Sequence, residues 1–257
     1  MKINILVNGC NGNMGKIICN LISKSNCLKV IAGFDSSIKQ LYNFPTFKYY
    51  KDLLKFISNT SNSVDVIIDF SAPNSTFDIL KYVALPFHIP IVIATTGFSN
   101  NQLSTIKSYS KNIPIFISSN MSFEINLLDN LLRYISPKMN KYDIEILEIH
   151  HNQKKDVPSG TAKMLANSIN ESLNNSKKIV YERTGKREKD EIGISSIRGG
   201  NIVGEHTISF FGQFDSLKIT HTAYSREIYA EGAIKASIFM FEHRYNNGLY
   251  EMKDLII

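Results

Sequence analysis

The first half of the chain alternates short, continuous apolar runs with longer segments of helical periodicity. The apolar runs predict strands at residues 3–8, 29–34, 65–70, 89–94 and 113–118. Helices are predicted between them, near residues 14–25, 52–58, 75–83 and 101–110. Continuous apolar strands that alternate with helices are typical of a parallel sheet covered on both faces. The first half is therefore predicted to be an α/β domain of the doubly wound, Rossmann type.

The second half has a different pattern, because apolar and polar residues alternate along most of its predicted strands. These strands lie at residues 142–150, 192–198, 201–211 and 216–224, and helices are predicted at 123–134, 161–173 and 226–241. Alternation predicts a mixed, largely antiparallel sheet with at least one open face, and hence a separate α+β domain. We expect residues 1–121 with about 226–257 to form the first domain, and residues 122–225 the second.

Composition narrows the class of protein. A chain of 257 residues that is 43% hydrophobic is neither a disulfide-stapled mini-protein nor a disordered chain. No apolar run approaches the ~18 residues of a membrane-spanning helix, and the N-terminal residues resemble a strand rather than a signal peptide. The three cysteines, Cys10, Cys19 and Cys27, have neither metal-ligand spacing nor a disulfide pattern. That usage favours a reducing, cytoplasmic compartment.

The net charge of +6 carries little information about partners. The densest basic segment, residues 177–191, interleaves acidic residues with its basic ones. A nucleic-acid-binding face would need basic residues that no acids oppose. We therefore expect neither a nucleic-acid partner nor a membrane partner.

A glycine-rich loop at residues 9–15 follows the first predicted strand and opens the first helix. Its GxxGxxG spacing would let a pyrophosphate approach the backbone N–H groups at the helix N-terminus. Asp35 ends the second predicted strand, where a carboxylate can accept hydrogen bonds from ribose hydroxyls. Because Ser36 and Ser37 follow it instead of an arginine, NADH is favoured over NADPH, although Lys39 weakens that preference.

Two further turns are candidates for cofactor binding. Residues 94–96 end the fourth predicted strand, and residues 118–121 end the fifth. Ligands of open α/β sheets bind at the carboxyl ends of the strands. Both turns are therefore expected to lie near the nicotinamide end of a dinucleotide.

The second half contains a segment, residues 148–161, that leaves a strand, crosses a polar loop and enters a helix. Ser159 is placed as the N-cap of that helix, so the N–H groups that follow it could bind a carboxylate. His150, His151 and Lys154 surround the same loop. Titratable groups beside an anion site suit proton transfer to an anionic substrate.

Two other interpretations of this segment are open. Histidine pairs at strand ends are often plain surface residues. A zinc site could instead recruit Glu148, Glu205, His206 and His221. Zinc is disfavoured, because adjacent histidines on a strand point to opposite faces and no HxH or HExxH spacing is present. We predict no metal.

On these motifs, the chain resembles the dihydrodipicolinate reductase family. The family's E-x-H-H-x-x-K-x-D-A-P-S-G-T-A motif is met at residues 148–162, with Val157 in place of Ala. Its R-x-G-x-I-V-G-E-H segment lies at residues 198–206, and its G-x-x-G-x-M-G loop at residues 9–15. Its F-[ST]-x-P segment lies within residues 64–73, and its T-T-G turn follows Ala94 in place of Gly. The resemblance covers essentially the whole chain.

The resemblance implies an NAD(P)H-dependent reduction of 4-hydroxy-tetrahydrodipicolinate, a step of lysine and diaminopimelate biosynthesis, by a cytoplasmic homotetramer. It implies that His150 is the catalytic acid/base and Lys154 a proton donor. It implies that His151, Gly160 and Thr161 bind the carboxylates of the substrate. The residues that it assigns to the dinucleotide are Gly9, Cys10, Asn11, Gly12, Asn13, Met14, Asp35, Ala94, Thr95, Thr96, Ser118, Ser119, Asn120 and Met121. In this scheme residues 122–225 bind substrate and form the tetramer.

Three alternatives are less favoured. A covalent semialdehyde dehydrogenase needs a catalytic cysteine in the second half, and the last cysteine is Cys27. A redox-sensing regulator needs a basic helix-turn-helix, whereas the second half predicts a sheet. An inactive paralogue would not need to retain His150 and Lys154.

Overall fold

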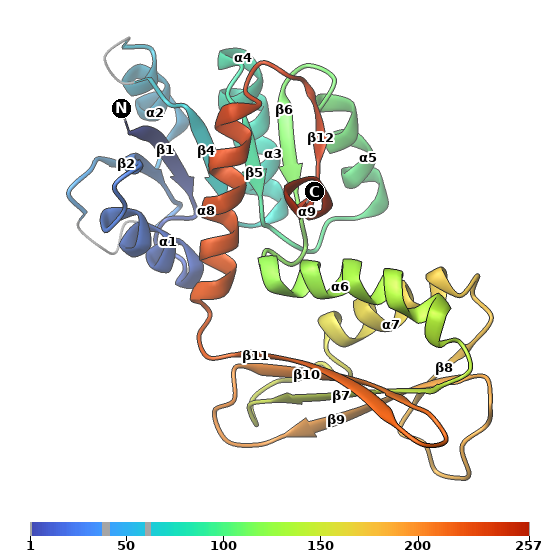
Figure 1. The fold of residues 1–257 in the computed structure, drawn as a ribbon. Coiled ribbons are helices and arrows are strands. Elements are labelled where there is room, and N and C mark those ends of the chain that lie inside the picture. The colour runs from blue at the N-terminus through green and yellow to red at the C-terminus, as the bar shows by residue number, and fades with distance from the viewer. Residues whose placement is uncertain (1, 38–41, 60–62, 257) are drawn as a thin grey trace. The chain divides into compact units, whose positions relative to one another are not determined.

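A computed structural model describes residues 2–37, 42–59 and 63–256 of the chain (Figure 1). The chain forms two compact units, Met1–Phe123 with Glu227–Ile257, and Glu124–Arg226. Lys39, which weakened the predicted preference for NADH, lies outside the described residues. Within the described ranges, no helix is long and apolar enough to cross a membrane.

The first unit is built on a sheet of seven parallel strands in the order β12-β6-β5-β4-β1-β2-β3. The strands are β1 (Ile3–Asn8), β2 (Leu28–Phe34), β3 (Thr46–Phe47), β4 (Val66–Asp69), β5 (Ile91–Ile93), β6 (Pro114–Ile117) and β12 (Gly248–Tyr250). The chain moves outward from β1 through β2 and β3, then returns to the other side of β1 as β4. This change of direction is the place where open α/β sheets bind ligands.

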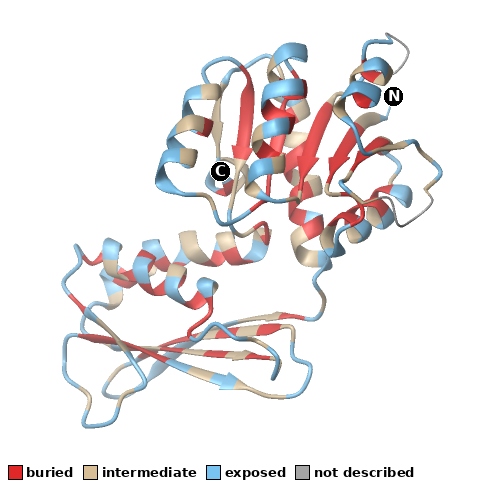
Figure 2. Cartoon of the chain, turned by 180° about the vertical axis from the view of Figure 1, so that it is seen from behind, coloured by how far each residue is buried: buried red, intermediate tan, exposed pale blue. Residues whose placement is uncertain are grey.

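Helices cover both faces of this sheet. They are α1 (Asn13–Ser23), α2 (Tyr50–Ile57), α3 (Pro73–Ile79), α4 (Leu85–Phe87), α5 (Asn100–Tyr109), α8 (Glu227–Glu242) and α9 (Met252–Ile256). A π-helical turn, Leu80–Ala84, joins α3 to α4. Side chains of β1 alternate between two cores, with Ile5 and Val7 facing α1 and α8 and Leu6 facing α2, α3 and α5. The inner strands β1, β2, β4, β5 and β6 are accordingly largely buried (Figure 2), and the edge strands β3 and β12 are half-buried.

The second unit is a mixed sheet of five strands in the order β11-β10-β7-β9-β8. The strands are β7 (Asp143–His150), β8 (Lys178–Tyr181), β9 (Glu191–Arg198), β10 (Gly204–Phe211) and β11 (Ser216–Ala223). One face packs against α6 (Phe123–Ile135) and α7 (Gly160–Ser172) around residues such as Leu132, Leu165 and Phe210. The predicted fold class, a parallel α/β domain with a second α+β domain, is confirmed.

The expectation of a largely antiparallel second sheet needs correction. The pairs β10–β11 and β10–β7 are antiparallel, but β7–β9 and β8–β9 are parallel. The strands β8 and β9 are joined by the loop at residues 182–190, whereas α7 lies between β7 and β8 in the chain. A helical crossover of that kind returns the chain to the sheet in the same direction.

Candidate functional site

The glycine-rich loop connects β1 to α1 and begins at a left-handed residue, Gly9, with φ of 81°. A side chain there would be strained and would also overlap the carbonyl oxygen of Phe70. Gly12 is the N-cap of α1, and it offers no capping side chain to the first backbone N–H groups of the helix. The first turn of α1 carries no acidic residue. These N–H groups therefore suit an anionic ligand such as a pyrophosphate.

A cavity of about 480 Å³ opens beside this loop at the carboxyl ends of β1, β2 and β4. Its lining comes from the ends of β1 and β2, from the glycine-rich loop, from the acid that follows β2 and from the segments between β3 and α3. The lining residues are Asn8, Gly9, Gly12, Phe34, Asp35, Ser36, Lys48, Tyr50, Phe70, Ser71, Ala72, Ser75 and Asp78. The residues thus fit a nucleotide, with N–H donors for phosphate and a carboxylate for ribose.

Asp35 has a second role that sequence reasoning did not anticipate, because its carboxylate braces the glycine-rich loop. It accepts hydrogen bonds from the backbone N–H of Asn11 at 2.9 Å and from that of Ser37 at 2.9 Å. The Asn11 amide donates to the Ser37 carbonyl oxygen, and Tyr42 donates to the Cys10 carbonyl oxygen at 2.7 Å. The loop is thereby fixed before any ligand arrives.

Two of the predicted cofactor residues turn their side chains into the core. Cys10 is fully buried, and burial raises the pKa of its thiol to about 12. Met14 packs against the same apolar cluster. The Cys10 side chain is therefore closed to a ligand and the Met14 side chain is half-buried, whereas Gly12 and Asn13 are exposed.

The end of β4 carries a buried acid, Asp69, that the sequence analysis did not single out. Its carboxylate accepts hydrogen bonds from Asn8, Ser71, Thr76 and Thr95 at 2.5–3.0 Å. Burial raises its pKa, and the four hydrogen bonds oppose that change. The position of Asp69 at the end of an apolar strand could have marked it as a candidate. Its hydrogen-bond partners are spread over residues 8–95, so the sequence alone does not show that they meet.

The two predicted cofactor turns lie at the carboxyl ends of β5 and β6. The Thr95 hydroxyl donates a hydrogen bond to Asp69 and accepts one from the backbone N–H of Ser71, at 3.0 Å each. Thr96 is exposed. In the second turn, Ser118 accepts a hydrogen bond from the backbone N–H of Asn120. Ala94 and Met121 are buried, and Ser119 is exposed.

In the second unit, Glu148 lies at the centre of a buried cluster at the end of β7. It is fully buried, and one oxygen contacts His150 Nδ1. The other oxygen accepts hydrogen bonds from Arg198 Nη2 at 2.7 Å and from the Ser159 backbone N–H at 3.3 Å. Burial alone would raise the pKa of Glu148, but the hydrogen bonds from Arg198 and His150 bring it below its ordinary value.

His150 therefore has an ionised carboxylate on one side of its ring. Burial lowers the pKa of His150 below its ordinary value, and the hydrogen bond to Glu148 opposes that effect. The ring of His206 lies edge-on at 5.2 Å between centroids. Burial lowers the pKa of His206 to about 4, so that ring is neutral at physiological pH.

Ser159 caps α7, as predicted, and accepts a hydrogen bond from the backbone N–H of Ala162 at 3.1 Å. Its Oγ also lies 3.1 Å from His206 Nε2. Gly160 is the exposed first residue of α7, and Thr161 follows it. Glu148 contacts both the cap of this helix and His150, so the predicted anion site and the predicted acid/base share one carboxylate.

The polar loop after β7 holds the other predicted residues. The Lys154 ammonium lies 2.9 Å from Asp156, which is largely exposed. The backbone N–H of Lys154 donates to the carbonyl oxygen of His151, at 3.2 Å. His151 is half-buried just beyond the end of β7.

Ligand atoms of Glu148, His150 and His206 lie within 4.8 Å of one another, a spacing that would accommodate a metal ion. The other two candidate ligands from the sequence lie outside this cluster. Both oxygens of Glu148 are already hydrogen-bonded, and Arg198 adds a positive charge beside them. A dication would have to displace that arginine, so the absence of a metal stays our prediction.

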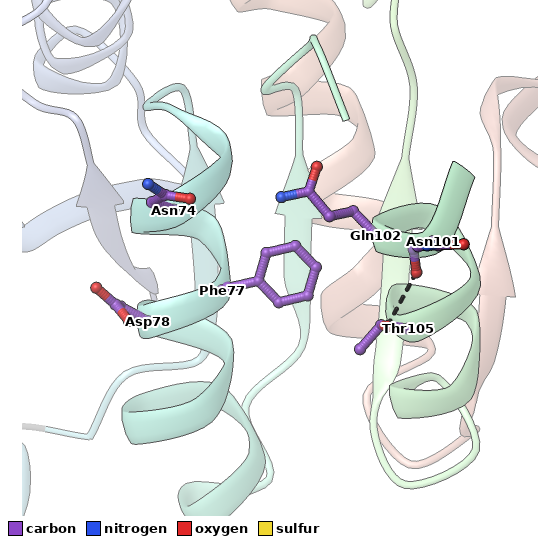
Figure 3. A pocket seen from close by; sticks show the side chains of 6 residues that line it. All are labelled: Asn74, Phe77, Asp78, Asn101, Gln102 and Thr105. Atoms are coloured by element: carbon purple, nitrogen blue, oxygen red, sulfur yellow. Dashed lines mark hydrogen bonds between the residues drawn. The ribbon is translucent and has the colours of Figure 1, made fainter. Parts of the chain in front are cut away.

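A separate, shallow cavity of about 380 Å³ lies between α3 and α5 in the first unit (Figure 3). Phe77 points into it from α3, and Gln102 borders it from α5. Thr105 donates a hydrogen bond to the Asn101 carbonyl oxygen along the α5 side. None of the predicted site residues lines this cavity.

Comparisons with known proteins cover the whole chain. The profile for the N-terminus of dihydrodipicolinate reductase matches residues 3–121, and the profile for its C-terminus matches residues 124–256. The 4-hydroxy-tetrahydrodipicolinate reductase of Clostridium tetani is 44% identical over 98% of this chain and 96% of its own length. That of Caldanaerobacter subterraneus subsp. tengcongensis is 42% identical over 100% of this chain and 99% of its own.

Solved structures show the same fold. A dipicolinate-bound dihydrodipicolinate reductase from Paenisporosarcina sp. TG-14 is 23% identical and covers 100% of both chains with a TM-score of 0.79. A probable dehydrogenase from Thermotoga maritima is 10% identical, covers 98% of this chain and 92% of its own, and gives a TM-score of 0.62.

Proposed function

This chain belongs to the dihydrodipicolinate reductase family, and on that premise we propose how its residues carry out the family's reaction. The reaction is the NAD(P)H-dependent reduction of 4-hydroxy-tetrahydrodipicolinate to tetrahydrodipicolinate, in lysine and diaminopimelate biosynthesis. We assign dinucleotide binding to the first unit and binding of the dicarboxylate substrate to Glu124–Arg226. A bound NAD(P)H would supply the hydride.

The contact of Glu148 with both His150 and the cap of α7 carries this assignment. It joins a proton-bearing imidazole to a helix N-terminus that can bind a carboxylate. Gly160 and Thr161 offer backbone N–H groups there, and His151 adds a further donor. The 4-hydroxyl group of the substrate leaves as water, and His150 and Lys154 supply the proton that accompanies hydride transfer to the dehydrated cyclic imine.

For the cofactor, the cavity beside the glycine-rich loop supports NADH over NADPH. Asp35 faces this cavity and would accept hydrogen bonds from the adenosine ribose, whereas a 2′-phosphate would meet its negative charge. Among the described lining residues, Lys48 is the one cation, and it lies at the exposed end of β3. NADPH is therefore accepted less well than NADH.

Replacing Asp35 by Ala is expected to weaken NADH binding far more than NADPH binding. The ribose contact is lost for NADH, while the repulsion of the 2′-phosphate is relieved for NADPH. The variant also loses the hydrogen bonds that the Asp35 carboxylate accepts from the backbone N–H groups of Asn11 and Ser37. That loss weakens the binding of both cofactors alike, so the ratio of the two dissociation constants is the readout. Fluorescence titration with each cofactor measures it, and an equal loss for both would refute the ribose contact.

The reaction is tested by following oxidation of NADH and, separately, of NADPH by the purified protein. The unstable substrate is made in situ from pyruvate and aspartate semialdehyde by the preceding synthase. Lys154→Ala is expected to lower kcat by about 10²-fold or more, because a positioned proton donor is removed. Lys155→Ala removes the exposed neighbouring lysine as a matched control. Absence of turnover in the wild-type chain, despite tight NADH binding, would favour an inactive paralogue.

The family also supports a cytoplasmic homotetramer in which the second unit forms the subunit contacts. Sedimentation of the purified chain tests this assembly. A monomer at micromolar concentration would contradict it.

A further inference from the structure

Glu148, which is fully buried, forms an ion pair with the half-buried Arg198 at 2.7 Å. They lie side by side in the register of the second sheet, since Glu148 pairs with Ser196 and His150 pairs with Arg198 across β7 and β9. The Arg198 guanidinium also donates to the carbonyl oxygen of Asp156 at 2.9 Å. The arginine thus holds Glu148 from one side and the polar loop from the other.

The hydrogen bond from His150 to Glu148 fixes which ring nitrogen is free. An ionised carboxylate can only accept, so Nδ1 carries a proton and donates it to Glu148. Nε2 is then the nitrogen that can exchange a proton with a ligand. Gly204 lies beside it, and a Cβ at that position would come within 3.0 Å of Nε2. A glycine there leaves space next to the reactive nitrogen.

We propose that Glu148, held in place by Arg198, is the positioning residue that sets the tautomer and orientation of His150 for proton transfer through Nε2. The proposal rests on the proposed function, since it gives His150 a proton to transfer. An acid that orients a histidine and stabilises its charged form is a recurring arrangement in proton-transfer sites. A purely structural ion pair would not require the bond to Nδ1.

The charges around the imidazole determine how its protonation changes with pH. Glu148 on β7 favours the imidazolium, whereas Arg198 on β9 and Lys154 in the loop disfavour it. His206 on β10 faces the ring as a neutral group. Glu148 is therefore the one negative charge among these neighbours, and its removal lowers the pKa of His150 further.

Glu148→Gln tests the proposal, because it keeps the size of the side chain and removes its charge. The glutamine amide would donate to Nδ1, so the proton of the neutral ring moves to Nε2. We expect kcat/KM to fall by about 10²-fold or more. If the imidazolium is the proton donor, activity declines as pH rises through its pKa, and this decline moves to lower pH in the variant. Wild-type-like activity with an unchanged pH profile would overturn the proposal.

The tautomer is read directly from ¹⁵N chemical shifts of histidine-labelled protein, with the His150 signal assigned by its loss in a His150→Gln sample. We expect the Nδ1-protonated pattern in the wild-type chain and the Nε2-protonated pattern in Glu148→Gln. The same tautomer in both proteins would also overturn the proposal. This readout needs no substrate, so it separates failure of the positioning role from failure of the proposed function.

Glu145→Gln is the matched control. Glu145 lies on the same strand and pairs with Arg183 at 2.7 Å and Arg187 at 3.2 Å, away from His150. We expect this variant to keep the wild-type pH profile and His150 tautomer. If it shifted both as Glu148→Gln does, the effect would be general to the strand and the assignment to Glu148 would be wrong.

Discussion

Replacing His150 with Gln is expected to lower kcat by about 10²- to 10⁴-fold, the range over which a positioned general acid or base contributes. Glutamine is of similar length and can still bond to Glu148, so the buried cluster keeps its packing. It cannot take up or release a proton near neutral pH. The effect should therefore fall on the chemical step, while NADH binding in the other unit stays nearly unchanged.

Single-turnover measurements with NADH and fluorescence titration of the cofactor separate these two effects. His88→Asn serves as the control, since the His88 side chain is exposed. Its backbone is in the left-handed region with φ of 53°, a conformation that asparagine adopts readily. It should keep wild-type kcat. An equal loss of NADH affinity in His150→Gln would remove His150 from the chemistry and give it a structural role.

The parts of the fold that follow from local sequence could be predicted. Continuous apolar runs predicted the inner strands of the first sheet, and the glycine spacing placed the loop before α1. Ser159 was identified as a helix cap because its preference for that position is local. The short strands β3, β8 and β12 were not predicted, since they do not belong to longer apolar runs as the equally short β4, β5 and β6 do.

The partners within the candidate sites could not be predicted in the same way. Glu148 meets Arg198 only because β7 and β9 are parallel and in a register that pairs His150 with Arg198. An antiparallel arrangement, which the alternating pattern favoured, would have placed other residues there. Similarly, Asn8 and Thr95 reach the Asp69 carboxylate because β4 lies between β1 and β5 in the sheet. Strand order and register are properties of the tertiary fold, which no local pattern encodes.

The sequence analysis assigned residues 226–257 to the first domain, but it did not predict how closely α8 approaches the turn that ends at Met121. This helix packs on α1 and on β4, β5 and β6 through a stripe of small residues that includes Ala230, Gly232 and Ala233. A Cβ on Gly232 would overlap the carbonyl oxygen of Met121, a backbone atom that cannot turn aside as a side chain can. Met121 ends the turn that we assign to the cofactor.

Gly232→Ala is therefore expected to destabilise the first unit by about 3 kcal/mol, at the upper end of the usual cost of overpacking. For a unit of this size that corresponds to a fall in Tm of about 6–12 °C. Because the helix must push the turn at Met121 away, NADH affinity should fall as well. Scanning calorimetry and cofactor titration measure the two effects on the same preparation. Gly185→Ala, at a glycine with open space around it, should change neither. A large fall in Tm with intact NADH affinity would mean that this turn supports the fold without binding the cofactor.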